Sequence, residues 1–380
     1  MTAIDHYSRF REAKYFSSLD GLRAISILAV IWYHVPELRP IWKTGFLGVH
    51  LFFVISGFLI TTLLLREKAQ YGRISLRNFY LRRTLRIFPA YYLTLGLFFL
   101  LCLSVPELRR DGLGTYLHNL PSFLTYTSNW FVNPWGPGRV VFVPAWSLAT
   151  EEQFYLFWPW IVAFSKKPRT PIIIMTALIV LNEIIKWRVG YWFFLDGYSF
   201  PITALNSISP AICMGCLLAF AFDRRRSFEA AWRVFGQRWS APAFVGLMLL
   251  ACSIPNDNNL HVFRMFYITL SMAFALAACV IRQDHMLKPL LANRPIRYIG
   301  SISYGMYLYH AFGLHFEDRF LAFTKPWPLL EFLAAAGSTV IIASISFWTY
   351  ERFFLKLKER FTKHRGTQQI TPAAVAIELS

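Results

Sequence analysis

Charged residues are scarce in this chain. Only 16% of its 380 residues are Asp, Glu, Lys or Arg, whereas about a quarter are charged in typical soluble domains. Hydrophobic residues make up 56% of the chain, and its mean hydropathy is +0.40. This much apolar surface needs a non-aqueous solvent. We therefore interpret the chain as an integral membrane protein and exclude a water-soluble globular domain.

Acidic residues are the scarcer of the two charge types, with 21 Asp and Glu against 39 Lys and Arg. In a soluble protein the net charge of +18 would suggest a nucleic-acid partner. Here most of the basic residues lie in alternate loops between apolar stretches, which follows the positive-inside rule. The pattern places both termini in the cytoplasm, and no nucleic acid is expected as a partner.

Cysteine is also scarce, with five in the whole chain. Cys213 and Cys216 have the spacing of a metal-binding pair, but no second pair accompanies them. We interpret them as small hydrophobic residues. Neither a disulfide framework nor a metal site is predicted.

Long apolar stretches are abundant, and a membrane-spanning helix needs about 20 such residues. We expect an all-α, polytopic membrane bundle of about ten transmembrane helices. The predicted spans are 20–36, 46–65, 87–105, 145–164, 171–187, 201–222, 240–255, 262–281, 303–322 and 328–350. The predicted organisation is a cytoplasmic segment 1–18, one transmembrane domain 19–350, and a flexible cytoplasmic tail 351–380.

Two ionisable residues, Arg23 and His34, lie within the first predicted span. Ionisable residues inside a membrane are costly and suggest a function. Eleven helical steps of about 100° return to nearly the same face, about 16 Å further along the axis. A guanidinium group suits phosphate and a neutral imidazole accepts a proton near pH 7. The alternative is that Arg23 reaches the interface and His34 makes a structural hydrogen bond.

Further polar residues accompany the next spans. His50 and Ser56 lie in the second span, and a strongly basic loop over 66–86 ends in a cluster of arginines, Arg82, Arg83 and Arg86. Such a cluster could hold phosphates, although positive-inside anchoring explains the same residues.

The fourth and ninth predicted spans also carry ionisable residues. The fourth holds two adjacent carboxylates, Glu151 and Glu152, either of which could orient a histidine, as in a nucleophile–histidine–carboxylate triad. The alternative is an interaction with the dipole at the helix N-terminus. His310 in the ninth span is interpreted as part of a buried hydrogen-bond network.

Taken in order, these segments resemble the acyltransferase 3 family of membrane O-acyltransferases. The resemblance covers roughly residues 19–350. It rests on LDGLRA at 19–24 followed by His34, GVHLFFVISGFLI at 48–60, FYLRRTLRIFPAYY at 79–92, WSLATEEQFY at 146–155 and SYGMYLYH at 303–310.

The resemblance implies a ten-helix fold that takes an acyl group, commonly acetyl, from cytoplasmic acyl-CoA. Members usually pass the group to a hydroxyl of a glycan or a glycosylated product. Arg23 and His34 fall on the family's Arg-x10-His motif, and Glu152 or its neighbour falls on the acidic motif. Position 50 is often Asp in the family and is His50 here. Some relatives carry an extra esterase-like domain, for which this chain leaves no room.

We therefore expect an O-acyltransferase in which Arg23, Arg82, Arg83 and Arg86 hold the CoA phosphates. His34 would act as general base or acyl relay, oriented by Glu151 or Glu152. The remaining motif residues are expected to contact the substrate: His50, Ser56, Trp146 and Ser147. No bound cofactor is expected. The expected partners are acyl-CoA as donor substrate, a carbohydrate acceptor and the lipids of a bacterial inner membrane.

Two other classes of protein fit parts of the pattern. A transporter of an anionic metabolite could line its path with Arg23 and His34, but the matching half-helices typical of such proteins are not evident. A non-catalytic membrane scaffold would tolerate neutral replacement of Arg23, His34 and Glu152. Turnover of acyl-CoA by the purified protein would exclude both.

Overall fold

The computed structural model describes residues 3–13, 15–35, 38, 44–133, 140, 142–189, 200–254 and 261–362, and within these ranges the chain is helical and has no strand. The first half contains α1 (Ala3–Glu12), α2 (Ser17–His34), η1 (Gly45–Leu47), α3 (Gly48–Tyr71), α4 (Leu76–Ser104), α5 (Pro106–Asp111), α6 (Leu113–Leu124), α7 (Ser128–Phe131), α8 (Ala145–Phe164) and α9 (Arg169–Val189). The second half contains α10 (Phe200–Asn206), α11 (Pro210–Asp223), α12 (Arg225–Phe235), α13 (Ser240–Ser253), α14 (His261–Ile281), α15 (Lys288–Leu291), α16 (Arg294–Ser301), α17 (Ser303–Phe320), η2 (Ala322–Thr324), α18 (Pro328–Ser346), the π-helix η3 (Phe347–Glu351) and α19 (Arg352–Thr362).

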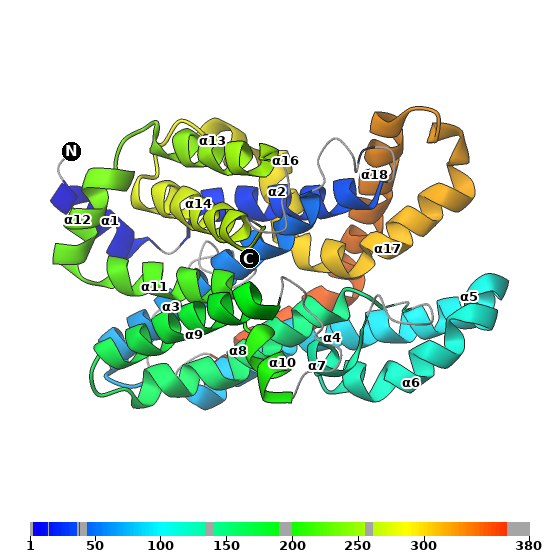
Figure 1. The fold of residues 1–380 in the computed structure, drawn as a ribbon, viewed down its shortest axis with the longest axis horizontal. Helices are drawn as coiled ribbons and strands as arrows, with labels where there is room; N and C mark the ends of the chain where they lie inside the picture. The colour runs from blue at the N-terminus through cyan, green and yellow to red at the C-terminus, as the bar shows by residue number, and fades with distance from the viewer. Residues whose placement is uncertain are drawn as a thin grey trace.

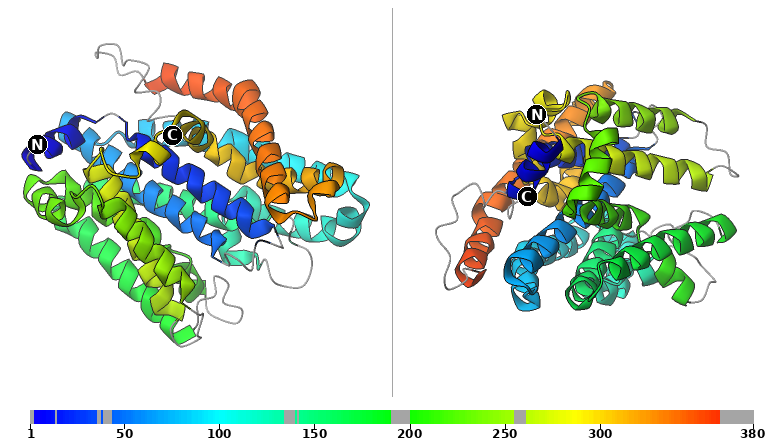
Figure 2. Two further views of the ribbon diagram at one scale, coloured as in Figure 1. Left: turned by 90° about the horizontal axis from the view of Figure 1, so that it is seen from above. Right: turned by 90° about the vertical axis from the view of Figure 1, so that its left-hand side faces the viewer.

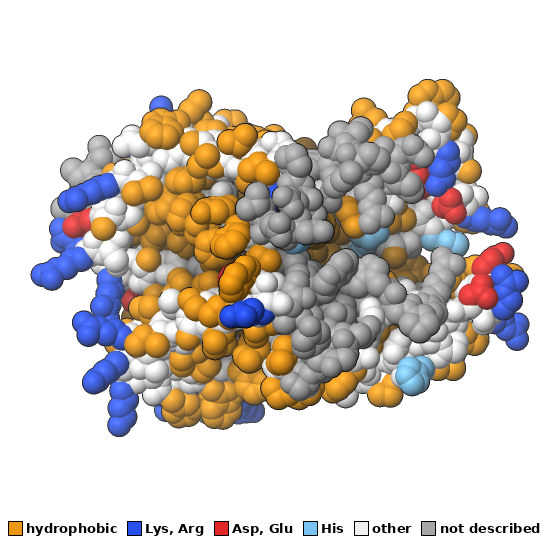
Figure 3. All heavy atoms as spheres, viewed as in Figure 1, with side chains coloured by type: hydrophobic (Ala, Val, Ile, Leu, Met, Phe, Trp, Pro, Cys, Tyr) orange, Lys and Arg blue, Asp and Glu red, His pale blue; other side chains and the backbone are white. Residues whose placement is uncertain are grey.

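Most of the long helices run along the length of the molecule (Figure 1), and α2 lies among them rather than at an edge. The N-terminus and α12 lie at one end, and α5 and the turn into α6 lie at the other (Figures 1 and 2). In Figure 3, apolar side chains cover much of the described surface between the two ends, whereas Lys and Arg gather mainly at the ends, above all at the end that carries α1 and α12. This distribution suits a bundle that crosses an apolar layer.

Five described helical segments are long and apolar enough to cross a membrane, and the number is seven if two bent pairs each count as one span. The five are Gly45–Tyr71, Leu76–Ser104, Arg169–Arg188, His261–Ile281 and Pro328–Leu357. All ten predicted stretches are largely helical, and α8 begins and ends where predicted. The all-helical class is confirmed within the described residues and is consistent with a membrane bundle, while ten spans and cytoplasmic termini stay predictions.

One predicted span, 201–222, is broken into two helices. Helices α10 and α11 meet at an angle of 52°, and Pro210 is the first residue of α11. Proline has no backbone N–H and disfavours helical geometry in the residue before it, so Pro210 favours a break between the two helices at this point.

The prediction of a loop over residues 66–86 is wrong, because α3 continues to Tyr71 and α4 already begins at Leu76. The turn between them is tight. Gly72 adopts a left-handed conformation with a φ of 69°, and the Ser75 hydroxyl caps α4 by accepting a hydrogen bond from the Asn78 N–H. The consequence for function is that the predicted arginine cluster stands on a rigid helix.

The predicted tail over 351–380 begins as helix, because η3 and α19 continue the chain to Thr362. Residues 363–380 lie outside the described ranges. The N-terminal segment likewise contains α1, whose residue Arg11 pairs with Asp223 at 2.6 Å.

The centre of the bundle depends on a close backbone contact between α3 and α11. A Cβ atom added at Gly57 would lie 2.1 Å from the Ile212 carbonyl oxygen, and one added at Gly215 would lie 2.2 Å from the Val54 carbonyl oxygen. Each glycine therefore faces the backbone of the other helix. Such contacts between small residues are a common way for membrane helices to associate.

We expect Gly57→Ala to destabilise the protein by about 1–3 kcal/mol or more, the range found for overpacked interiors. The added methyl group meets backbone, which cannot move aside without separating the two helices. The matched control is Gly96→Ala in α4, where no atom lies within 4 Å of an added Cβ. Thermal unfolding in detergent should show a lower midpoint for Gly57→Ala alone. Equal midpoints for the two variants would contradict the contact.

Candidate active site

Helix α2 is continuous from Ser17 to His34 and presents Arg23 and His34 at different depths of the bundle. The guanidinium group of Arg23 lies within electrostatic range of Arg83, Glu151 and Tyr155. His34 lies at the other end of α2, about 16 Å further along the axis. Arg23 and His34 are therefore too far apart along α2 to contact the same atom of a ligand.

The ring of His34 is oriented by its own helix. Its Nδ1 lies 2.8 Å from the carbonyl oxygen of Val30. A carbonyl oxygen only accepts, so Nδ1–H is the donor and Nε2 of the neutral ring carries the lone pair. His34 is also an exposed residue. This arrangement gives a proton acceptor with a defined reactive nitrogen.

A second histidine, His310, packs against the first. The ring centroids of His34 and His310 are 5.0 Å apart, and His310 Nδ1 lies 2.7 Å from the Tyr307 carbonyl oxygen. The Tyr307 ring stacks on His310, and its hydroxyl lies 2.6 Å from Ser147 Oγ. Ser147 is thereby connected to His34 through Tyr307 and His310. The predicted network around His310 exists, but its direct contact with His34 was not foreseen.

The two carboxylates of α8 face different neighbours. Glu151 accepts hydrogen bonds from the hydroxyl groups of Ser56 and Tyr155, the latter at 2.5 Å. Glu152 lies within electrostatic range of Arg83, Tyr126 and Tyr304. The His34 ring is held at Nδ1 by the Val30 carbonyl oxygen. That Glu151 or Glu152 orients His34 stays a prediction.

Three of the four predicted phosphate-binding arginines come together. The guanidinium groups of Arg23, Arg83 and Arg86 lie within electrostatic range of one another, and that of Arg83 lies 5.3 Å from the centre of the Tyr155 ring. Arg82 points elsewhere and pairs with Glu67 at 3.2 Å.

The cluster of Arg23, Arg83 and Arg86 has the properties of an anion site. Among the described residues, Arg23 Nη1 is buried without a hydrogen-bond partner, and a carboxylate oxygen of Asp20 lies 3.8 Å away. Three like charges brought together repel one another, and a bound phosphate would relieve that repulsion. The residues present therefore fit the phosphates of the expected donor.

The other predicted substrate-binding residues have different surroundings. His50 lies in a separate buried cluster with Thr269, Lys186 and Glu183, where its Nδ1 is 3.4 Å from the Thr269 hydroxyl. The Trp146 ring packs edge-on against Phe53. Ser56, in contrast, lies at the centre of the region through its bond to Glu151.

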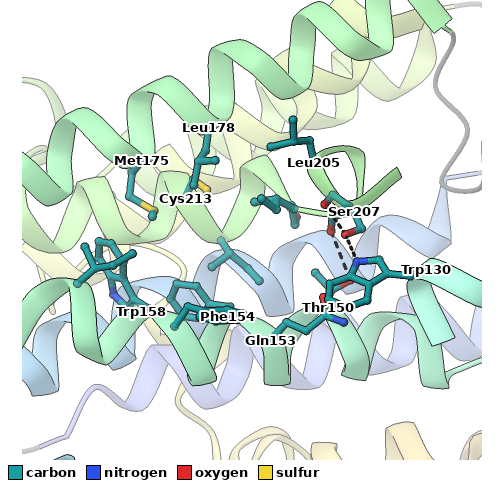
Figure 4. A pocket seen from close by; sticks show the side chains of 16 residues that line it. Trp130, Thr150, Gln153, Phe154, Trp158, Met175, Leu178, Leu205, Ser207 and Cys213 are labelled. Atoms are coloured by element: carbon teal, nitrogen blue, oxygen red, sulfur yellow. Dashed lines mark hydrogen bonds between the residues drawn. The ribbon is translucent and has the colours of Figure 1, made fainter. Parts of the chain in front are cut away.

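A cleft of about 240 Å³ opens on the other side of α8, between α8, α9, α10 and α11. Figure 4 shows Phe154, Trp158, Met175, Leu178 and Leu205 around it, with a small polar end where the Trp130 indole donates to Ser207 Oγ at 2.9 Å. Its walls are almost wholly apolar, and its described lining residues include no Asp, Glu, Lys, Arg or His. We therefore place the chemistry on the Glu151 side of α8.

Within the described ranges, the helical bundle thus holds Arg, His and Glu side chains in the interior of the apolar segments. The family model for an acyltransferase domain matches residues 16–348, so the chain belongs to this acyltransferase family, as the sequence motifs predict.

Three relatives illustrate the match. The peptidoglycan O-acetyltransferase OatA of Listeria monocytogenes is 29% identical over 91% of this chain and 56% of its own length. The protein named "Putative peptidoglycan O-acetyltransferase YrhL" of Bacillus subtilis is 32% identical over 80% of this chain and 49% of its own. A protein named "Putative O-acetyltransferase" of Staphylococcus aureus strain COL is 28% identical over 94% of this chain and 60% of its own.

The chain thus spans about half to 60% of the length of these relatives. No solved structure matches it significantly.

Proposed function

We propose that this protein is a membrane O-acyltransferase that moves an acyl group, acetyl in the first instance, from acyl-CoA to a hydroxyl of a glycan or glycosylated molecule. One observation carries the proposal. Polar side chains of α2, α4, α8 and α17 follow one another through the bundle from the Arg23 cluster, past Glu151 and Ser147, to His34. A row of ionisable groups at membrane depth is costly without a ligand or a reaction to serve.

The donor would enter at the arginine end. Arg23, Arg83 and Arg86 bind its phosphates, and the pantetheine arm extends beside α2 toward His34. Glu151 and Glu152 act on this donor side by balancing the guanidinium charges, and Ser56 and Tyr155 hold Glu151 in place. Binding energy from the phosphates then positions a thioester that makes few polar contacts of its own.

The transfer itself needs one base and one nucleophile. His34 Nε2 removes the proton of the acceptor hydroxyl as its oxygen attacks the thioester carbonyl carbon. The carbon–sulfur bond breaks, and the leaving thiolate takes the proton from the imidazolium, so that CoA-SH and the ester are the products. A relay in which Nε2 is itself acylated uses the same geometry and would leave an acyl-imidazole that rapid quenching can trap.

The acceptor class follows from the relatives, two of which carry peptidoglycan O-acetyltransferase in their names. We propose a carbohydrate acceptor that reaches His34 from the end of the bundle opposite the arginines. The basic end then faces the cytoplasm, as the positive-inside rule predicts for ten spans with both termini inside, in a bacterial inner membrane.

The test is acetyl transfer by the purified protein in proteoliposomes, with acetyl-CoA and soluble peptidoglycan fragments as acceptors. We expect release of CoA that depends on the acceptor, and a product heavier by one acetyl group in mass spectrometry. Liposomes without protein are the control. The proposal fails if labelled donor or acceptor accumulates unchanged inside the vesicles without CoA release, which is the behaviour of a transporter.

A further inference from the structure

A second cavity, of about 310 Å³, lies at the start of α2 and is separate from the apolar cleft. We call it the α16 cavity, because most of its lining comes from that helix. It is lined by Tyr15, Asp20, Arg294, Arg297, Tyr298, Ser301 and Phe347. These residues come from the segment before α2, from α2 and α16, and from η3.

The lining combines two arginines with three aromatic rings, which is the chemistry that binds a nucleotide. Arginine pairs with phosphate through two parallel hydrogen bonds. Purine rings stack on aromatic side chains and on guanidinium planes. Arg297 already lies 5.1 Å from the centre of the Tyr15 ring and donates from Nε to the Tyr15 hydroxyl at 3.0 Å. A guanidinium group and an aromatic ring are thus held together before any ligand binds.

The α16 cavity adjoins the arginine cluster of the proposed donor site. Asp20 is the link, because it lines the cavity, accepts a hydrogen bond from the Tyr15 hydroxyl and lies 3.8 Å from Arg23 Nη1. Its side chain is only 5% exposed, and its Oδ1 has no hydrogen-bond partner in the described ranges of the chain. The charges of Arg297 and Arg86 both reach this carboxylate.

The walls of the α16 cavity are fixed by close backbone contacts. A Cβ added at Gly300 would lie 2.0 Å from the Asp20 carbonyl oxygen, and one added at Gly21 would lie 2.3 Å from the Leu291 carbonyl oxygen. His285 Nε2 lies 2.9 Å from Ser18 Oγ, and burial, with the charge of Lys288, lowers the pKa of His285 to about 4. This imidazole is therefore neutral at pH 7 and serves as a structural contact. A preformed cavity binds without the cost of ordering its walls.

We propose that the α16 cavity binds the adenine-nucleotide end of the donor. The inference rests on the proposed function and adds a subsite to it. Arg294 and Arg297 contact the phosphates of the nucleotide, and the aromatic rings stack against its base. Arg23, Arg83 and Arg86 then hold the diphosphate where the pantetheine arm begins. Neither Arg294 nor Arg297 belongs to the motif residues around His34.

The first experiment measures binding of adenosine 3′,5′-bisphosphate, the nucleotide end alone, to the purified full-length protein by calorimetry. We expect saturable binding that weakens about tenfold or more in Arg297→Ala, because hydrogen bonds to charged groups contribute about 1.5–3 kcal/mol. The matched control is Arg226→Ala, which removes the same charge from an exposed position on α12. Absence of binding to the unaltered protein, or equal affinity of both variants, would overturn the proposal.

The second experiment compares two donors, acetyl-CoA and S-acetylpantetheine, which lacks the nucleotide. Arg297→Ala should raise the KM for acetyl-CoA about tenfold while leaving kcat/KM for S-acetylpantetheine unchanged. A merely structural role would affect both donors equally and would overturn the assignment, and Arg297→Lys, which keeps the charge, should recover part of the affinity. Failure of the unaltered protein to use either donor would instead contradict the proposed function.

Discussion

His34→Ala is expected to lower kcat for acyl transfer by about 10²–10⁴-fold, the usual contribution of a general base. The reason is the defined reactive nitrogen. With Nδ1–H bound to the Val30 carbonyl, only Nε2 can take the acceptor proton. Turnover would be followed as release of CoA in proteoliposomes, with the amount of folded protein matched by size-exclusion chromatography.

The control for this substitution is His118→Ala, which removes an exposed histidine from α6 and should leave turnover unchanged. His310→Ala gives a graded comparison, since His310 contacts His34 and would position it rather than react. We expect a smaller loss of kcat there with little change in the KM for the donor. Turnover of His34→Ala within a few-fold of the unaltered protein would refute the assignment of the base.

Arg23→Ala is expected to raise the KM for acetyl-CoA about 30-fold or more, because truncating one partner of a buried charge pair costs about 2–5 kcal/mol. Arg23 is only 12% exposed, and its Nη1 has no hydrogen-bond partner within the described part of the chain. The measurement is the dependence of initial rate on acetyl-CoA concentration.

A matched control is Arg73→Ala, which removes an exposed arginine from the turn before α4 and should leave the KM unchanged. Because Arg23 also lies beside Asp20, the thermal midpoint of each variant should be measured alongside the kinetics. Arg23→Lys keeps the charge but not the planar donor geometry. Its KM for acetyl-CoA should therefore lie between those of the unaltered protein and Arg23→Ala. An unchanged KM in Arg23→Ala would show that phosphate binds elsewhere.

Much of the helical pattern is predictable from the sequence, because hydrophobic stretches and breakers act locally. The bounds of α8 and nearly those of α14 follow from apolar runs of the right length. The loop predicted before residue 87 is wrong, because a run of Arg and Lys ends an apolar stretch without ending the helix. Arg and Lys both have good helix propensity. A helix can leave the membrane without ending.

The arrangement of the site is less predictable, because it depends on contacts between helices far apart in the chain. Spacing along α2 predicts that Arg23 and His34 share a side, and the structure places Arg23 near Arg83 and Glu151 and packs His34 against His310. No pattern in the sequence reveals that Ser56 binds Glu151, 95 residues away. The three-residue spacing of Tyr307 and His310 places both on one face of α17, but it does not indicate that His34 of α2 packs there.

The separation of the arginine cluster from His34 has an electrical consequence. All the negative charge of a CoA donor resides in its phosphates, which would stay at the basic end throughout the cycle. In the proposed mechanism, the acetyl group passing along α2 would be neutral, and the proton taken from the acceptor would return to the thiolate beside it. Moving one charge fully across a membrane costs about 2.3 kcal/mol per 100 mV. With this arrangement, the rate of acetyl transfer to an acceptor at the outer surface would be nearly independent of the membrane potential.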